Sequence, residues 1–333
     1  MAPIARLARS LLRIIMVVLI VTAAGLAALA MALRQPALTS LSFKGLQRAD
    51  PELLRQHVVF LTNDVRPRSA NHPENLDRAA HYIATRFRVA NGTTSVQTFH
   101  ARGRQYSNVI GRWGPSDPGL PVLVIGAHYD SFGETGDLPG ADDNASGTAG
   151  LLELARLLGE HRVTSPVLLV AYTTEEPPFF GSELMGSAVH ANSLSSDRQI
   201  VRGMICLEMI GYFSNEQSWP NALFDFVYPS TGDFIGVAGG WPDRSLARFV
   251  KRAMAGSGGI RVVSFSGPRE TSDASDHRNY WSHGWKAVVI TDTAFLRNPN
   301  YHTRHDTAAT LDYQRMARVV DGVLNAALHA SDL

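Results

Sequence analysis

Residues 122–147 read VLVIGAHYDSFGETGDLPGADDNASG, and this stretch decides the fold class. Its first six residues form a short apolar run typical of a buried strand in a parallel sheet. His128 and Asp130 follow that run, and in an open α/β sheet ligands bind beyond the carboxyl ends of the strands. A histidine that binds a metal usually donates its second ring N–H to a carboxylate or carbonyl oxygen. The stretch therefore predicts a metal-binding histidine at a strand end, with Asp130 placed to orient it.

The second half of this stretch carries a cluster of polar side chains. A Gly-rich loop over residues 131–141 leads to Asp142, Asp143 and Asn144, and Ser146 then opens a helix. A cation would relieve the repulsion between the adjacent carboxylates. The same cluster also suits a solvated turn or a helix cap, so both interpretations stay open on these residues alone.

Two later strand patterns also end in carboxylates. Residues 167–171 precede Glu175 and Glu176, and residues 204–207 precede Glu208. Because an α/β sheet brings such strand ends to one rim, we expect these side chains to meet His128 there. Adjacent carboxylates suit a metal site in which one binds the cation and the other accepts a proton, although Glu175 and Glu176 could also only cap the next segment.

The remaining periodicity predicts one α/β domain over residues 50–333, with three layers: a mixed, mostly parallel central sheet and helices on both sides. An apolar face at helical spacing indicates helices at residues 50–61, 75–87, 148–158, 244–255 and 310–328. Alternating or β-branched patterns indicate further strands at residues 95–98, 107–113, 224–228, 234–237 and 286–290.

Composition excludes some classes of protein and of site. The net charge of +1 over 333 residues, without a basic stripe, gives no basis for nucleic-acid binding. Cys206 is the only cysteine, which rules out an intramolecular disulfide and a thiolate metal cluster. Any metal ligands must therefore be oxygen and imidazole donors. The oligomeric state is not determined by these features.

The N-terminus predicts a membrane segment. Residues 14–33 carry no charge and are almost wholly apolar, and twenty helical residues span about 30 Å, the thickness of the hydrocarbon core. Arg6, Arg9 and Arg13 precede them, so we expect residues 1–13 in the cytoplasm and the domain outside it, joined by a linker at residues 34–49. The alternative is a signal peptide cleaved at small residues within 28–32, which would give a secreted protein.

Several motifs in order make residues 50–330 resemble the zinc aminopeptidases of metallopeptidase family M28. They are HYDS at 128–131, GADDNASG at 140–147, Glu175-Glu176, Leu207-Glu208-Met209, Ser275-Asp276-His277, and Tyr301-His302-Thr303 with Asp306-Thr307. No one of these motifs is specific by itself, but their combination and order are.

The resemblance implies a role for each matching residue. Two zinc ions per chain would share Asp143; one would also bind Glu176 and His302, and the other His128 and Glu208. Glu175 would be the general base, Asp130 would orient His128, and the Asp143–Asn144 peptide bond would be cis. Ser275, Asp276 and His277 would lie near the cleft without binding metal.

The implied function is a membrane-anchored zinc exopeptidase that removes N-terminal residues from peptides outside the cytoplasm. A glutaminyl-cyclase-like acyltransferase with a single zinc, on the same fold, is one alternative. A non-catalytic receptor-like module is another, although none of the five ligand positions is lost. The sequence departs from the family pattern after Glu176, at PPFFGS, in a loop expected to border the pocket for the substrate's first side chain. Phe179 and Phe180 could form an apolar wall there, but we expect them to be buried under the loop.

Overall fold

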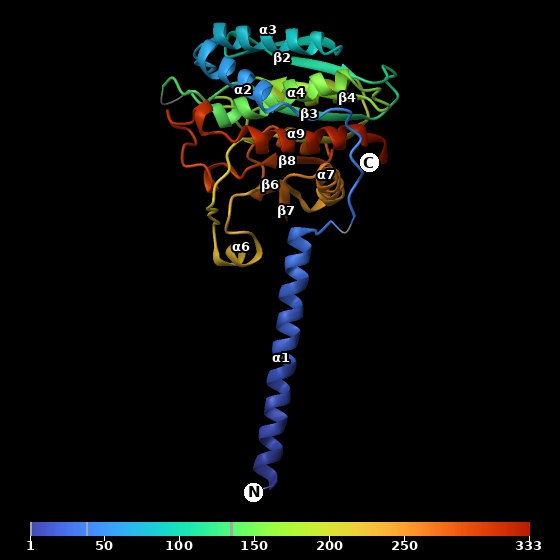
Figure 1. Cartoon of the computed structure of the whole chain (residues 1–333), viewed down its shortest axis with the longest axis vertical. Helices are drawn as coiled ribbons and strands as arrows, with labels where there is room; N and C mark the ends of the chain where they lie inside the picture. The colour runs from blue at the N-terminus through green and yellow to red at the C-terminus, as the bar shows by residue number, and fades with distance from the viewer. Residues whose placement is uncertain (1, 38, 134–135) are drawn as a thin grey trace.

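The computed structural model describes residues 2–37, 39–133 and 136–333. It contains a long N-terminal helix, α1 (Ala2–Arg34), that projects from a layered α/β domain (Figure 1). The other helices are α2 (Pro51–Val59), α3 (Pro73–Val89), α4 (Gly147–Gly159), α5 (Gly186–Ser196), α6 (Ala222–Val227), α7 (Arg244–Ser257), α8 (Arg278–Trp281) and α9 (Tyr313–Leu328). The strands are β1 (Thr93–Ala101), β2 (Arg104–Trp113), β3 (Val122–His128), β4 (Val167–Tyr172), β5 (Val201–Leu207), β6 (Phe234–Gly240), β7 (Arg261–Gly267) and β8 (Ala287–Thr291).

The strands described form one mixed sheet in the order β1-β2-β4-β3-β5-β8-β6-β7. The four central strands β4, β3, β5 and β8 run parallel. Strands β1 and β2 pair antiparallel with each other and β2 with β4, and β6 pairs antiparallel with β8 but parallel with the edge strand β7. Parallel pairing therefore brings the carboxyl ends of the central strands to one rim, as predicted.

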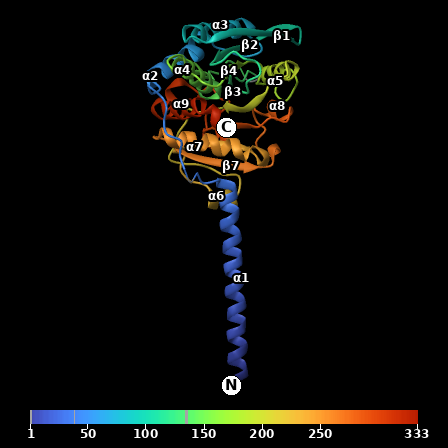
Figure 2. The ribbon, with the colours of Figure 1, turned by 90° about the vertical axis from the view of Figure 1, so that its right-hand side faces the viewer.

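Both faces of the sheet are covered by helices, which gives the predicted three layers (Figure 2). On β3, Leu123, Ile125 and Ala127 belong to the larger core cluster, which includes residues of α2, α3, α4, α7 and α9. Val122 and Val124 pack on the opposite face with residues of α5 and α8. This alternation explains why the strand reads as a continuous apolar run, because each successive side chain meets a different buried layer.

One predicted strand is wrong. Residues 224–228 contribute to a helix, α6, because the side chain of Asn221 accepts a hydrogen bond from the backbone N–H of Phe224 and caps it. Alternating apolar residues over so short a segment do not distinguish a strand from one helical turn. Strand β7 and helix α5 were not predicted. The predicted helix at 310–328 begins at Tyr313, where Asp312 caps it.

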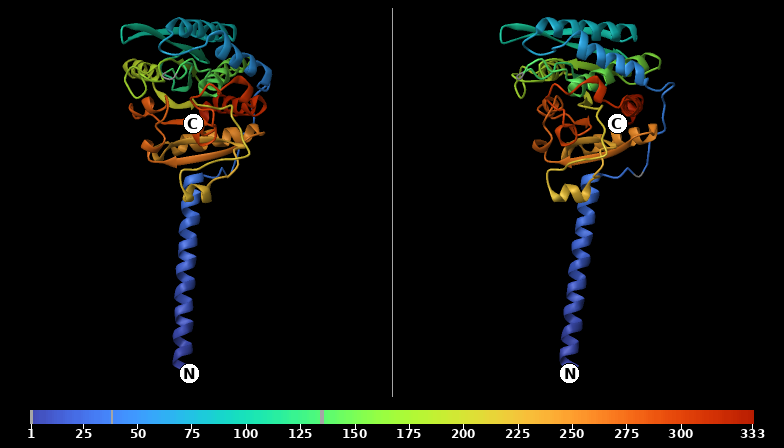
Figure 3. Two further views of the ribbon diagram at one scale, coloured as in Figure 1. Left: turned by 90° about the vertical axis from the view of Figure 1, so that its left-hand side faces the viewer. Right: turned by 60° about the vertical axis from the view of Figure 1, so that its left-hand side comes forward.

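The segment predicted as a linker at 34–49 is attached to the domain surface. The backbone N–H of Leu41 donates to the carbonyl of Arg252, that of Lys44 to Asn325 Oδ1, and that of Ala49 to Asp321 Oδ1. Figure 3 shows this segment running along the side of the domain.

A buried arginine holds the loop between β3 and α4. The side chain of Arg68 is fully buried, and its guanidinium donates to the carbonyls of Leu61, Tyr129, Pro139 and Gly140. Burial lowers the pKa of Arg68 to about 10, so the side chain stays charged at neutral pH. This one side chain therefore closes both ends of the loop that leads to Asp143.

We expect Arg68→Met to lower the free energy of unfolding by about 3 kcal/mol or more, because each buried carbonyl left without a donor costs about 1–3 kcal/mol. Urea unfolding of the detergent-solubilised chain measures this loss. Arg88→Met, on the exposed side of α3, is the matched control and should change stability little. Equal stability of the two variants would contradict the role of Arg68.

Candidate metal centre

The rim at the carboxyl ends of the central strands collects the predicted site residues. His128 is the last residue of β3, Glu175 and Glu176 follow β4, Glu208 follows β5, and His302 lies in the loop after β8. Their positions follow from the parallel register, in which His128 pairs with Tyr172 at the end of β4.

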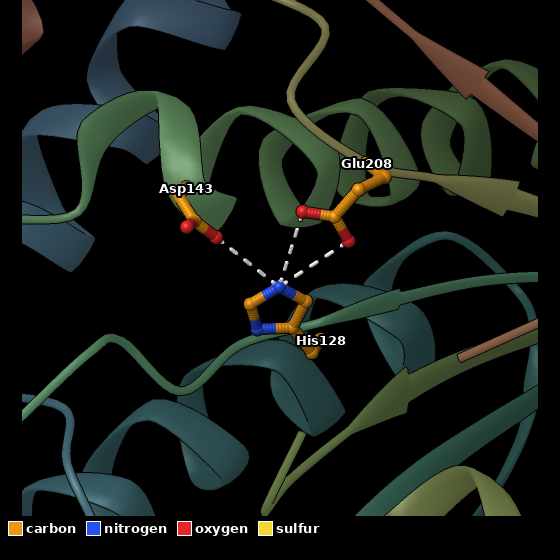
Figure 4. Close-up of side chains that lie close together, drawn as sticks. All are labelled: His128, Asp143 and Glu208. Atoms are coloured by element: carbon orange, nitrogen blue, oxygen red, sulfur yellow. Dashed lines mark hydrogen bonds and ion pairs between the residues drawn. The ribbon is translucent and has the colours of Figure 1, made fainter. Parts of the chain in front are cut away.

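His128, Asp143 and Glu208 form one group of donor atoms (Figure 4). His128 Nε2 lies 3.3 Å from Asp143 Oδ1 and 3.3 Å from Glu208 Oε2. One donor atom from each residue lies within 4.8 Å of the others, a spacing that could hold a metal ion. The imidazole and the Asp143 carboxylate are buried.

Asp143, Glu176 and His302 form a second group of the same kind. His302 Nε2 lies 2.9 Å from Asp143 Oδ2 and 3.6 Å from Glu176 Oε1. Asp143 therefore turns one carboxylate oxygen toward each imidazole, so that the two groups share it. The structure brings together all five residues that were predicted as ligands.

The backbone around Asp143 is held by partners far away in the sequence. Asp306 accepts hydrogen bonds from the backbone N–H groups of Asp142 (2.9 Å) and Asp143 (3.1 Å). Asn144 Oδ1 accepts from the N–H groups of Gly147 and Met209. The Asp143–Asn144 peptide bond is cis, which confirms the prediction. These contacts fix the direction of the Asp143 side chain.

Asp130 contacts His128 as predicted, and it also binds the backbone of the two glutamates that follow β4. Nδ1 of His128 is 3.1 Å from the Asp130 carbonyl oxygen and 3.4 Å from Oδ1, so the carbonyl is its hydrogen-bond partner. The Asp130 carboxylate instead accepts the backbone N–H groups of Glu175 (3.2 Å) and Glu176 (3.0 Å). Asp130 thereby fixes the position of both glutamates relative to β3.

Glu175 belongs to neither donor group, yet it lies beside them. Its Oε2 is 3.9 Å from His128 Nε2, and its side chain is buried. Burial raises the pKa of Glu175 well above its usual range, although His128 opposes this. The Glu175 carboxyl group therefore lies close to the two donor groups without belonging to either.

The charges of the two donor groups are strongly coupled. Burial and the neighbouring Asp143 carboxylate raise the pKa of Glu176 to about 8. Burial alone would lower the pKa of His302, but Asp143 and Glu176 raise it to about 9. Burial alone would raise the pKa of Asp143, but the imidazoles of His128 and His302 hold it below its usual range. Without a cation, the groups therefore retain protons to offset their crowded negative charge.

Two atoms of the second group fit a cation directly. Among the described residues, the buried Glu176 Oε1 has no hydrogen-bond partner, and the buried His302 Nε2 makes no aligned hydrogen bond even to Asp143 Oδ2, 2.9 Å away. Buried polar atoms without partners are rare and call for an explanation such as an ion. Two imidazoles and three carboxylates are a donor set that zinc accepts, so the residues present fit such an ion.

Sequence reasoning missed some of the supporting residues. Ser275 was placed near the cleft, and its hydroxyl donates to Glu208 Oε2 at 2.6 Å, so it orients a donor without joining the group. Asp306 stood in a quoted motif but received no role. Arg68 lies in no motif and carried no signal, because its carbonyl partners come from separate segments.

Aromatic rings border the second group. His302 is stacked between Phe132 and Tyr301, with ring centroids 4.0 Å and 3.8 Å away. Phe179 is buried as predicted, but the prediction is wrong for Phe180, whose side chain is 42% exposed and lies under the guanidinium of Arg278.

The sequence is similar to those of known proteins. Residues 108–327 match the model of peptidase family M28. The uncharacterized protein YfbL of Escherichia coli (strain K12) is 47% identical over 288 residues, which cover 84% of this chain and 88% of that protein. A probable zinc metalloprotease of Pyrenophora tritici-repentis is 28% identical over 224 residues, covering 61% of this chain and 44% of its own length, so this chain spans less than half of that relative.

Solved structures share the fold. The LapA aminopeptidase of Legionella pneumophila superposes with a TM-score of 0.69 at 21% identity, covering 84% of this chain and 71% of that one. A glutaminyl cyclase of Bacteroides thetaiotaomicron superposes with a TM-score of 0.64 at 18% identity, covering 86% and 98%. Because the family model matches more than half of the sequence, and YfbL is similar over most of both proteins, the chain belongs to peptidase family M28, as its motifs predicted, and is a metallopeptidase.

Proposed function

We propose that the chain is a zinc aminopeptidase that is anchored in a membrane and works outside the cytoplasm. The observation that carries this proposal is the Asp143 carboxylate, which offers one oxygen to each of two donor groups while Glu175 stays outside both. Shared carboxylates of this kind suit a pair of ions that act on one peptide bond. The similarity to proteins described as a zinc metalloprotease and an aminopeptidase supports the same class of reaction.

Two zinc ions would be held in this arrangement. His128, Asp143 and Glu208 would bind one, and Asp143, Glu176 and His302 the other. When bound, the ions would supply Lewis acidity that polarises the scissile carbonyl and acidifies water. Asp130, Asp306 and Ser275 would keep the donors oriented, as their hydrogen bonds indicate.

Glu175 would move the proton. Its carboxylate would accept a proton from the attacking water and then donate that proton to the leaving amine, which completes hydrolysis with no net change in the enzyme. Burial helps the first transfer, because a raised pKa makes the Glu175 carboxylate a stronger base.

Helix α1 would be the anchor. Residues Arg9–Arg34 form a helix long and apolar enough to cross a bilayer. The arginines at its N-terminal end support an orientation with the N-terminus in the cytoplasm. Cleavage as a signal sequence is the alternative, since an N-terminal apolar helix meets the same criteria.

A glutaminyl-cyclase-like activity is the second candidate, because a protein of that description superposes over 86% of the chain. It would use a single zinc ion. The presence of two donor groups favours the peptidase, and the retention of all five donors argues against a receptor without catalysis.

We expect Glu175→Gln to retain its zinc and to lower kcat for aminoacyl arylamides by about 10²-fold or more, because the proton acceptor is lost while the donor groups stay intact. Steady-state kinetics and elemental analysis of the purified full chain measure both quantities. Glu183→Gln, an exposed glutamate nearby, is the control. Equal turnover of the two variants would exclude Glu175 as the general base.

Metal counting tests the sharing of Asp143. We expect two zinc ions per chain, nearly complete loss of both in Asp143→Ala, and loss of one in Glu176→Gln, which belongs to a single group. Asp137→Ala, at an exposed position in the preceding loop, should keep both. One ion per chain, together with ammonia release from N-terminal Gln, would favour the cyclase instead.

Stability of the metal-free chain should fall as the pH rises from about 6 to 9. The pKa values of Glu176 and His302 are raised in the folded chain to about 8 and about 9, so their protonated forms stabilise it, and this contribution disappears as those protons leave. Zinc would replace the protons, so the metal-loaded chain should show a smaller decline. Thermal unfolding at pH 6 and at pH 9, with chelator or with zinc, measures how far stability falls in each case. An equal fall with chelator and with zinc would refute the prediction.

A further inference from the structure

The end of α1 is packed into the domain. Leu33 is buried in a cluster with Val227 and Tyr228 at the end of α6, Phe234 of β6 and Val263 of β7. Ala30, one turn earlier, packs against the same cluster. The end of the apolar helix therefore packs directly against the domain (Figure 1).

Hydrogen bonds also hold the C-terminal end of α1 against the domain. The ammonium group of Lys251, on α7, donates to the carbonyls of Arg34 (2.7 Å) and Gln35 (3.2 Å). A cation on the last carbonyls of a helix satisfies acceptors that have no partner within the helix and interacts favourably with its dipole. The side-chain amide of Gln35 also donates to the hydroxyl of Ser266 on β7. The direction of α1 relative to the domain is thereby fixed.

The short helix α6 exposes apolar side chains beside the C-terminal end of α1. Phe226 is 74% exposed and Leu223 is 41% exposed. Figures 1 and 3 show α6 at the end of the domain from which α1 projects. Trp219 packs on Phe224 and Tyr228 of the same region, and its indole N–H donates to the carbonyl of Pro229. Aromatic side chains at the end of an apolar span are typical of the membrane–water interface.

The length of the apolar run determines the position of α6 relative to the hydrocarbon core of the bilayer. Residues 14–33 span about 30 Å, which matches the hydrocarbon core, so Leu33 lies near its boundary. Leu33 contacts the α6 region directly, and the exposed Arg34 follows at headgroup level. We propose that α6 inserts Phe226 and Leu223 into the lipid interface of the leaflet on the domain side, as a second membrane contact besides α1.

The contact of α6 with lipid would keep the β7 edge of the sheet facing the membrane. Strand β7 is the edge strand that contacts α1, and β5, which Glu208 directly follows, lies three strands away. Strands are spaced about 4.8 Å apart, so the candidate metal centre would begin about 14 Å from that edge. Two contacts with the membrane, one of them a rigid span, would keep the centre at a constant height above the lipid.

The inference rests on α1 spanning a membrane, and the test uses the full chain in phospholipid vesicles. Phe226→Cys and Val89→Cys are labelled with the environment-sensitive fluorophore NBD; native Cys206 is buried and should stay unlabelled. Val89 is 73% exposed at the end of α3, far from α1, and is the matched control (Figure 1). We expect NBD at 226 to be quenched severalfold more than NBD at 89 by nitroxide-labelled lipids, and to be shielded from aqueous iodide.

Equal iodide access at both positions, without quenching by nitroxide lipids, would overturn the proposal. Failure of the chain to float with the vesicles would overturn it as well, through loss of the anchor. Hydrolysis of aminoacyl arylamides is measured separately on the same vesicles. Active enzyme without lipid contact at 226 would refute the docking alone, whereas lipid contact without hydrolysis would refute the proposed peptidase alone.

Discussion

The position of the Asp143 carboxylate is the constraint on which the rest of the site depends. Each of its oxygens faces a different imidazole, at 3.3 Å from His128 and 2.9 Å from His302. A small rotation of this side chain would separate the two donor groups. The backbone contacts from Asp306, the Asn144 side chain and the loop held by Arg68 all restrain it. Several buried hydrogen bonds therefore act together to position this one carboxylate.

The buried charge around this carboxylate links stability to function. A set of carboxylates and imidazoles buried together is costly unless protons or cations balance it. The raised pKa values of Glu175 and Glu176 reflect that cost. A metal ion bound there would balance the charge of the donor groups and leave the Glu175 carboxyl group outside them. The same crowding would thus account for both the proposed metal ligands and the proposed general base.

Much of the fold and of the candidate site could be predicted because its signals are local. Apolar runs at 122–127, 167–171 and 204–207 predicted three central strands, and the polar residues directly after them predicted the rim. The resemblance to family M28 then distinguished Asp143 from Asp142 and added His302, which follows no predicted strand end closely. The helix at 222–227 could not be predicted from its pattern, since six residues with mixed polarity fit either element.

The sequence by itself determined which chemical groups are present and which strand ends carry them, and it determined that residues 14–33 are long enough to span a bilayer. Only the tertiary structure decided that Asp130 holds the glutamates more than the histidine, that Asp306 supports Asp143, and that Lys251 locks the end of α1. These contacts join segments that are widely separated along the chain. The direction of a side chain on a loop is set by such distant partners, whereas the periodicity that predicts strands and helices involves only neighbours.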